Sequence, residues 1–197
     1  MKPGAMKSMT IMWLRVRRSA LDLFSDRSGV AAIEFAMIVP LMLVLFFGTV
    51  EFSSGLAVDR KVTLMARTLS DLTSQNISVN DTQLTNIFNA STGIMTPYSA
   101  TPTQSTITEL YVDPTTKVAR VQWSKGAAPR GTGTTVAIPT ALQVGGTYLI
   151  YSEVSYKYVP SIGYVMTKAG ITMSDFTYTR PRQSTCVMYN TTVCTTT

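Results

Sequence analysis

The sequence predicts an α+β protein in which one long N-terminal helix, transmembrane and then amphipathic, packs on a small and mainly antiparallel β-sheet domain. Three observations predict this class. Residues 28–50 form an almost unbroken apolar run, residues 58–72 carry apolar side chains at helical spacing, and the rest holds β-branched and aromatic segments divided by turn residues. We therefore divide the chain into a leader at 1–29, a long helix at 30–75 and an α+β head domain at 76–197.

The apolar run is long enough to cross a membrane. Its 23 residues, at about 1.5 Å of rise each, exceed the roughly 30 Å hydrocarbon core of a bilayer. Inside lipid the backbone must satisfy its own hydrogen bonds, so we expect a helix. Glu34 is the single charge of the run, and Pro40 removes a backbone donor in mid-membrane. Membrane helices tolerate proline, so Pro40 alone is weak evidence of a functional role. An intramembrane carboxylate costs a few kcal/mol unless it finds a partner, so Glu34 is the stronger candidate for a functional residue.

Positive charge is concentrated before this run. The net charge is +6, and residues 1–29 hold six basic and two acidic side chains. Lys and Arg before a membrane helix favour a cytoplasmic N-terminus, so we expect a single-pass membrane protein with its C-terminal domain on the opposite side of the membrane. Because the leader accounts for most of the charge, nucleic-acid binding is not indicated.

Beyond the run, the helix is predicted to continue, so that one helix extends from about Ser28 to Ser74. Five apolar residues follow at steps of four, three, four and three, the spacing of one helix face: Val58, Val62, Met65, Leu69 and Leu72. Such a stripe is more often core than a partner surface. We therefore expect it to be buried against the head domain.

A second, shorter helix is predicted at the start of the head domain. Asn80 or Asp81 suits the N-cap of a helix over 82–89. Its expected inner face consists of Leu84, Ile87 and Phe88. Residues 91–106 are rich in Ser, Thr and Pro, and we expect a loop there.

The periodicity then changes to that of strands. Residues 106–112 and 118–123 are predicted to pair as a hairpin around a turn at 113–116. Alternation places three apolar side chains of the second strand on one face: Ala119, Val121 and Trp123. Residues 125–136, rich in Gly, Pro and Thr, are expected to form a mobile loop.

Two further strands are predicted, at 147–159 after a Gly-Gly pair and at 171–178. Most tyrosines fall in or beside these predicted strands. We expect them to form the sheet core, although an exposed aromatic binding face is the alternative. They are Tyr111, Tyr148, Tyr151, Tyr156, Tyr158, Tyr164 and Tyr178.

The two cysteines, Cys186 and Cys194, lie close together near the C-terminus. An even count in an exported domain favours a disulfide. The loop that it would close is small, so by lowering the entropy of the unfolded chain the bond would stabilise the folded state by about 2–3 kcal/mol. Histidine is absent, so neither a metal site nor another cofactor is expected.

No catalytic residues are assigned, and the protein is expected not to be an enzyme. Without histidine, no Ser or Cys nucleophile has its usual base, and no phosphate-binding loop is present. The acidic residues of the predicted strands and turns show no spacing that suggests an acid-base pair, and they are Glu109, Asp113, Glu153 and Asp175.

The start of the apolar run carries a further pattern. Gly29 is followed by four small or apolar residues beginning with Val30, then by Glu34, and Arg27 stands just before. This resembles the site read by the prepilin peptidase of type IV pilus systems, and it implies cleavage after Gly29. The new α-amine of Val30 would then lie four residues from Glu34, which can pair with it on the same helix or on a neighbour's. The alternative is that Glu34 reaches back to lipid headgroups near Arg27.

The segment at 26–52 resembles more narrowly the N-terminus of TadE-like pseudopilins, minor pilins of the Tad (type IVc) pilus. The family features are a Glu-Phe pair, a mid-helix Pro and a closing Glu-Phe. The matching residues here are Glu34-Phe35, Pro40 and Glu51-Phe52. The resemblance implies assembly roles for Glu34, Phe35, Pro40 and Glu51, although Glu51 also suits an ordinary charge at a membrane interface. The head domain carries further similarities to TadE-like proteins, in segments 118–124 and 147–160 and in the Pro181-Arg182 pair. The loop between Cys186 and Cys194 resembles in position the C-terminal disulfide loop of many pilins.

The resemblance implies a pseudopilin that takes part in Tad pilus assembly through subunit packing. The resemblance also implies a location in the bacterial inner membrane, with the C-terminal domain in the periplasm. The protein's expected partners are the inner membrane, the prepilin peptidase, and other pilins and pseudopilins. The first alternative is an uncleaved single-span membrane protein with a periplasmic scaffold or sensor domain. The second is a secreted binding protein cleaved near residues 55–57, but the apolar run is longer than a typical signal-peptide core.

Overall fold

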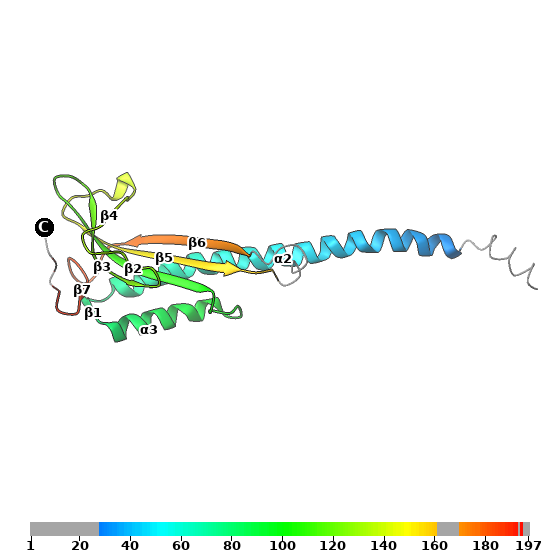
Figure 1. Ribbon diagram of the computed structural model, residues 1–197, viewed down its shortest axis with the longest axis horizontal. Coiled ribbons are helices and arrows are strands. Elements are labelled where there is room, and N and C mark those ends of the chain that lie inside the picture. The colour runs from blue at the N-terminus through cyan, green and yellow to red at the C-terminus, as the bar shows by residue number, and fades with distance from the viewer. Residues whose placement is uncertain (1–27, 161–169, 193, 195–197) are drawn as a thin grey trace, which may run out of the picture. The chain divides into compact units, whose positions relative to one another are not determined.

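The computed structural model describes residues 28–160, 170–192 and 194 (Figure 1). Contacts between residues divide the chain into two compact units, Met1–Thr49 and Val50–Thr197. The described residues of the first unit belong to one element, the first part of helix α2 (Ser28–Ser74). The second unit holds the rest of α2 and the head domain. Most of the predicted leader, residues 1–27, lies outside the described residues.

The bounds of α2 confirm the prediction of one helix through both the apolar run and the amphipathic segment. Its 47 residues include Pro40. In the second unit, the predicted stripe is buried: Val58, Val62, Met65 and Leu69 are fully buried, and Leu72 is partly buried against the same cluster. The spacing of apolar residues was therefore sufficient to identify the face of α2 that packs on the head domain.

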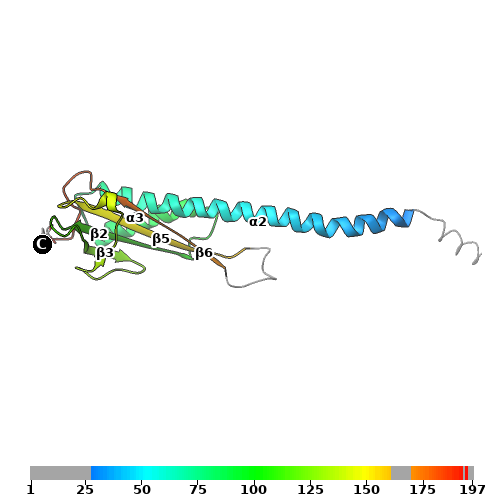
Figure 2. The ribbon, with the colours of Figure 1, turned by 90° about the horizontal axis from the view of Figure 1, so that it is seen from above.

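Five strands form one antiparallel sheet in the order β4–β3–β2–β5–β6 (Figures 1 and 2). Their bounds are β2 Thr103–Val112, β3 Ala119–Gly126, β4 Thr135–Val136, β5 Tyr148–Tyr158 and β6 Ile171–Thr179. The predicted hairpin is β2–β3, and the two later predicted strands are β5 and β6. A long helix packed on an antiparallel sheet confirms the α+β class.

Strand β5 runs antiparallel to α2, and hydrogen bonds join the two elements. The Ser70 hydroxyl donates to the Ile150 carbonyl at 3.2 Å, and the Ser152 hydroxyl donates to the Ala66 carbonyl at 2.6 Å. Both serines are fully buried. Each hydroxyl therefore has a partner in the apolar interface, as buried polar groups require, and each fixes the position of α2 along β5.

Helix α3 (Asp81–Thr92) covers the same face of the sheet as α2, with Leu84 and Ile87 buried in the shared cluster and Phe88 packed against it. Asn80 is its N-cap, in a capping box with Gln83. The prediction of a loop over 91–106 was wrong at both ends. Helix α3 reaches Thr92 and is followed by the 3₁₀ helix η1 (Gly93–Met95), and β2 already begins at Thr103. Ser91 is buried in the part of α3 that was predicted as loop, and its hydroxyl donates to the Ile87 carbonyl, so this polar side chain is satisfied within the helix.

A β-bulge changes the predicted faces of the hairpin. The register shifts between Glu109 and Leu110, so that Trp123 pairs with Glu109 but Val121 pairs with Leu110. Trp123 therefore packs in the cluster with α2, whereas Val121 and Ala119 belong to a second cluster on the other face. The prediction that all three apolar residues share one face was wrong, because it assumed unbroken alternation.

The second cluster lies under the connection from β3 to β5. Ile138 of this connection is buried there with Leu110, Val121 and Leu149. The connection holds β4 and the 3₁₀ helix η2 (Thr140–Leu142). The loop predicted at 125–136 is thus shorter than expected, since β3 extends to Gly126 and Thr135–Val136 pairs with β3.

The C-terminal segment returns to α2 and α3. Strand β7 (Met188–Tyr189) pairs in parallel with β1 (Ser78–Val79). Cys186 and Cys194 are joined by the predicted disulfide, with their Cα atoms 6.2 Å apart. In the Pro-Arg pair, the Arg182 N–H donates to the Ser74 carbonyl at 2.9 Å and its guanidinium pairs with Asp71.

The tyrosines confirm the prediction of a sheet core. Five of them are buried in or beside the strands: Tyr111, Tyr148, Tyr151, Tyr156 and Tyr158. Tyr178 is half-buried and stacks on Tyr151 with 4.6 Å between ring centroids. Tyr164 lies outside the described residues.

Candidate functional site

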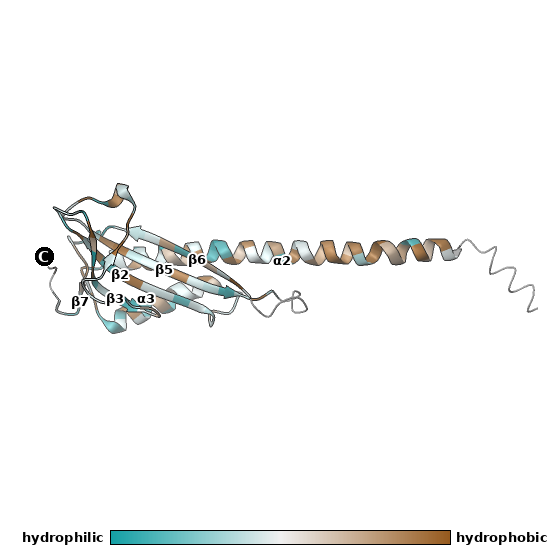
Figure 3. Cartoon of the chain, turned by 45° about the horizontal axis from the view of Figure 1, so that its top comes forward, coloured by the Kyte–Doolittle hydropathy of each residue, from teal (hydrophilic) through white to brown (hydrophobic). Residues whose placement is uncertain are grey.

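The apolar part of α2 is exposed along its whole length. From Gly29 to Val50 each side chain is exposed except Val39, which is half-buried. Figure 3 shows this part of the helix as predominantly hydrophobic. Among the described helices, α2 alone is long and apolar enough to cross a membrane, with a mean hydropathy of 2.5 in its most apolar window. So large an apolar surface requires lipid or other helices around it.

Gly29 and Val30 form the first turn of this helix. A Cβ atom added at Gly29 would meet nothing within 4 Å, so a larger side chain there has room within this chain. Val30 is 54% exposed. The predicted cleavage bond is therefore not protected by other described residues, and cleavage itself stays a prediction.

Glu34 and Phe35 lie one turn further on. Glu34 is exposed and has no hydrogen-bond or ion-pair partner within the described part of the chain. Glu34 lies four positions after Val30, so both side chains lie on the same face of the helix. Phe35 is 69% exposed. In an apolar environment the Glu34 carboxylate would require a positive or donor group from elsewhere.

Pro40 lies inside α2, where its missing N–H leaves the Ala36 carbonyl without an intrahelical partner. A different polar group of the run is satisfied internally, since the Thr49 hydroxyl donates to the Leu45 carbonyl at 2.8 Å. The freed carbonyl at Ala36 and the Glu34 carboxylate are thus both acceptors in this half of α2. An assembly role for Pro40 stays a prediction.

Glu51 has an intramolecular contact that the sequence did not reveal. The Tyr158 hydroxyl, at the end of β5, donates to its carboxylate at 2.8 Å. Burial, and then this hydrogen bond, raises the pKa of Tyr158 to about 12, so the phenol stays protonated and remains a donor. Glu51 therefore attaches the end of β5 to α2, one residue after the apolar run ends.

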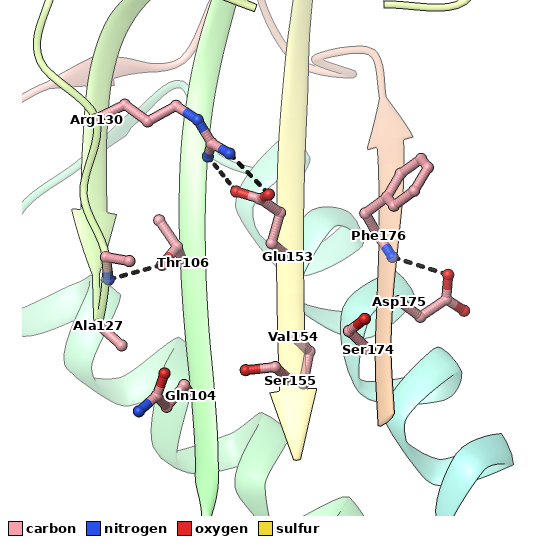
Figure 4. A pocket seen from close by; sticks show the side chains of 11 residues that line it. Gln104, Thr106, Ala127, Arg130, Glu153, Val154, Ser155, Ser174, Asp175 and Phe176 are labelled. Atoms are coloured by element: carbon pink, nitrogen blue, oxygen red, sulfur yellow. Dashed lines mark hydrogen bonds and ion pairs between the residues drawn. The ribbon is translucent and has the colours of Figure 1, made fainter. Parts of the chain in front are cut away.

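The opposite face of the sheet holds a cleft of about 260 Å³ between β2, β5, β6 and the segment after β3 (Figure 4). Arg130 forms a bidentate ion pair with Glu153, and the Tyr151 hydroxyl also donates to Glu153 at 2.8 Å. Burial acts to raise the pKa of Glu153, but the bonds from Arg130 and Tyr151 outweigh it and hold the pKa below its usual value. The ion pair thus fixes the segment after β3 above the sheet, with both charges already compensated.

The four acidic residues noted in the sequence do not come together. Glu153 and Asp175 line this cleft, and Asp175 accepts from the Phe176 N–H at 2.8 Å. Asp113 caps the β2–β3 turn, where the N–H groups of Thr115 and Thr116 hold its pKa below its usual value. No group of three or more His, Cys, Asp or Glu side chains that could hold a metal ion occurs in the described ranges.

Glu109 is the residue that sequence reasoning missed most clearly. Its side chain is buried and accepts from the Val187 N–H at 2.6 Å, while the Trp123 indole donates to the Val187 carbonyl at 2.7 Å. Burial raises the pKa of Glu109 to about 8, against the opposing effect of these donors. Both backbone groups of Val187 are thereby bonded to the sheet. We call Glu109, Trp123 and Val187 the C-terminal clasp.

The fold defines a protein with one helix that is exposed and apolar in its first half and buried against an antiparallel sheet in its second. Comparison with known families adds that residues 29–69 match the model of the family described as "TadE-like protein". Searches of curated proteins and of solved structures find no match. The family match confirms the TadE-like resemblance over this segment, and it supports a protein related to the Tad pilus.

Proposed function

We propose that this protein is a TadE-like pseudopilin that joins a Tad pilus or its initiating complex. It is inserted in the bacterial inner membrane with its N-terminus in the cytoplasm and its head domain in the periplasm, and a prepilin peptidase cleaves it after Gly29. It has no catalytic role and acts through packing against other pilins and pseudopilins. The observation that carries the proposal is the family match at 29–69, which covers both the exposed apolar half of α2 and most of the buried stripe.

The mechanism assigns the central role to Glu34. Cleavage creates an α-amine on Val30, with a pKa of about 7.7–8.0 in model peptides, so it is largely charged at neutral pH. Pairing with Glu34 of a neighbouring subunit compensates both charges in an apolar environment and sets the axial offset between the helices. Removing one partner of such a buried pair costs about 3–5 kcal/mol, which is enough to disfavour each subunit contact.

Glu34→Gln tests this mechanism because it keeps the shape of the side chain and removes the charge. We expect the variant to be inserted and cleaved like the wild type but to be lost from complexes with other pilins. Met37→Leu is the matched control, since Met37 is also exposed on α2 and the change conserves its volume. Co-purification with the other pilins and the number of pili per cell provide the measurements. Wild-type values of both for Glu34→Gln would refute the role of Glu34.

Cleavage is tested separately by the N-terminal residue of the protein isolated from its own membranes. We expect Val30. Gly29→Trp should block processing, and the open space around Gly29 means that the block would arise at the peptidase and not from misfolding. A chain that keeps residues 1–29 in cells with functional pili would support the uncleaved scaffold or sensor instead.

A further inference from the structure

One end of the head domain carries an exposed apolar patch. Its members come from α2, from the residue after β5 and from the start of β6, and all belong to the second compact unit. Their exposed fractions are 75% for Phe52, 44% for Leu56, 45% for Val159 and 60% for Ile171. We call these four residues the juxtamembrane patch. An apolar groove of about 380 Å³ runs among Phe52, Leu56 and Ile171.

The patch is held in place by packing and by a hydrogen bond. Tyr158 and Met173 lie over Gly55 of α2, where an added Cβ would be 3.8 Å and 3.7 Å from their side chains. The Tyr158–Glu51 hydrogen bond closes the same contact. The end of β5 and the start of β6 are therefore fixed against α2 beside Gly55, and the patch residues next to them are held in place as well.

Chain connectivity places the patch next to the end of the apolar run, whatever the angle between the two units. Phe52 follows Val50 by two residues, so their Cα atoms are at most about 7.6 Å apart. Leu56 follows Val50 by six helical residues, which is about 9 Å of rise. The groove brings Ile171 to the level of Phe52 and Leu56.

The dimensions of a bilayer then decide what covers the patch. The helical run from Gly29 to Val50 is about 33 Å long, so it fills the roughly 30 Å hydrocarbon core. The headgroup region adds about 5–8 Å on each side. Phe52, about 3 Å of rise beyond Val50, falls within this interfacial layer, and Leu56, about 9 Å beyond, lies at its outer edge. Apolar and aromatic side chains are favoured in this layer.

We infer that the juxtamembrane patch inserts into the interfacial layer of the bilayer and holds the head domain against the membrane surface. The partner is a lipid surface. Lys157, exposed beside Tyr158, suits anionic headgroups. Two carboxylates also line the groove: Glu51 accepts from the Tyr158 hydroxyl, and Asp59 lies one turn further along α2 than Gly55, on the side away from the run. This inference rests on the membrane insertion of the apolar run that the proposed function includes.

The test uses the full chain in vesicles of phosphatidylethanolamine and phosphatidylglycerol. Because Cys186 and Cys194 are bonded, a single added cysteine can be labelled selectively with an environment-sensitive fluorophore. Ile171→Cys is the test variant. Phe176→Cys is the matched control, since Phe176 is 55% exposed on the same strand but about 17 Å further along it. Val44→Cys reports whether the apolar run is inserted.

We expect the label at 171 to show blue-shifted emission and to lose that emission when nitroxide lipids are added. The label at 176 should show neither effect. Equal signals at 171 and 176 would overturn the inference. So would a blue shift at 171 without lipid quenching, because it would mean that protein, such as a second copy, covers the patch. If the label at 44 is not quenched either, the failure lies in the membrane insertion of the proposed function.

Discussion

The C-terminal clasp makes the stability of the head domain depend on pH. Burial raises the pKa of Glu109 from 4.5 to about 8 in the folded protein, and unfolding returns it to its ordinary value. The folded state therefore holds a proton that the unfolded state releases. The contribution of Glu109 to stability is fully present below its unfolded pKa, and it is lost as the pH rises towards about 8. Each pH unit between the two values costs about 1.4 kcal/mol, which gives a loss of about 3 kcal/mol from pH 5 to pH 7.5.

Glu109→Gln removes this titration and keeps an oxygen that can accept from the Val187 N–H. We expect the unfolding free energy of the wild type to fall with pH in this window, and that of Glu109→Gln to change little. The assay is urea unfolding of the full chain in detergent micelles. Trp13→Phe is the background, because it leaves Trp123, whose indole is bonded to Val187, as the single tryptophan reporter. The chain has no histidine, so few other side chains titrate between these pH values.

Glu153→Gln is the control for this experiment. The pKa of Glu153 is lowered, so its carboxyl is ionised throughout the window and its replacement should leave the pH dependence intact. Glu109→Gln with the same pH slope as the wild type would refute the reasoning, because another group would then be responsible. A Glu109→Gln variant more stable than the wild type only above about pH 7 would support it strongly.

Two further predictions concern stability. Met65→Ala, at a fully buried position of the α2 stripe, should destabilise the head domain by about 2–5 kcal/mol in the same assay, whereas Met37→Ala on the exposed half should leave it nearly unchanged. Replacing both Cys186 and Cys194 by Ser should cost about 2–3 kcal/mol, read as a lower urea midpoint, and should not abolish folding because the loop is short and terminal. An unchanged urea midpoint for Met65→Ala would show that this side chain stabilises the fold less than its burial implies. An unchanged midpoint for the double Ser variant would show that the disulfide stabilises it less than the length of its loop implies.

Local patterns in the sequence were sufficient for much of the fold. The spacing of Val58, Val62, Met65 and Leu69 identified the buried face of α2, and Asn80 marked the start of α3. Helix and strand periodicity depend on neighbouring residues, so one chain reveals them. The bulge beside Glu109 could not be predicted in this way, because alternation in the β3 sequence continues through it without a Gly or Pro signal.

The contacts that were missed all join distant parts of the chain. Glu109 and Val187 are 78 residues apart, Arg130 and Glu153 are 23 apart, and Glu51 and Tyr158 are 107 apart. An acidic residue on a predicted strand looks the same in the sequence whether it faces water or a buried N–H group. In contrast, the pattern of Gly29 and Glu34 is a spacing within one helix, and for that reason the sequence could nominate them.

The bonds between α2 and β5 have a mechanical consequence. Glu51–Tyr158, Ala66–Ser152 and Ser70–Ile150 lie in succession along two antiparallel elements, over about 28 Å of helix. A pull along the axis of α2 loads these bonds together, in shear, and cannot open them one after another as a zipper would. The joint between helix and head is therefore arranged to transmit tension from the N-terminal half of α2 into the sheet.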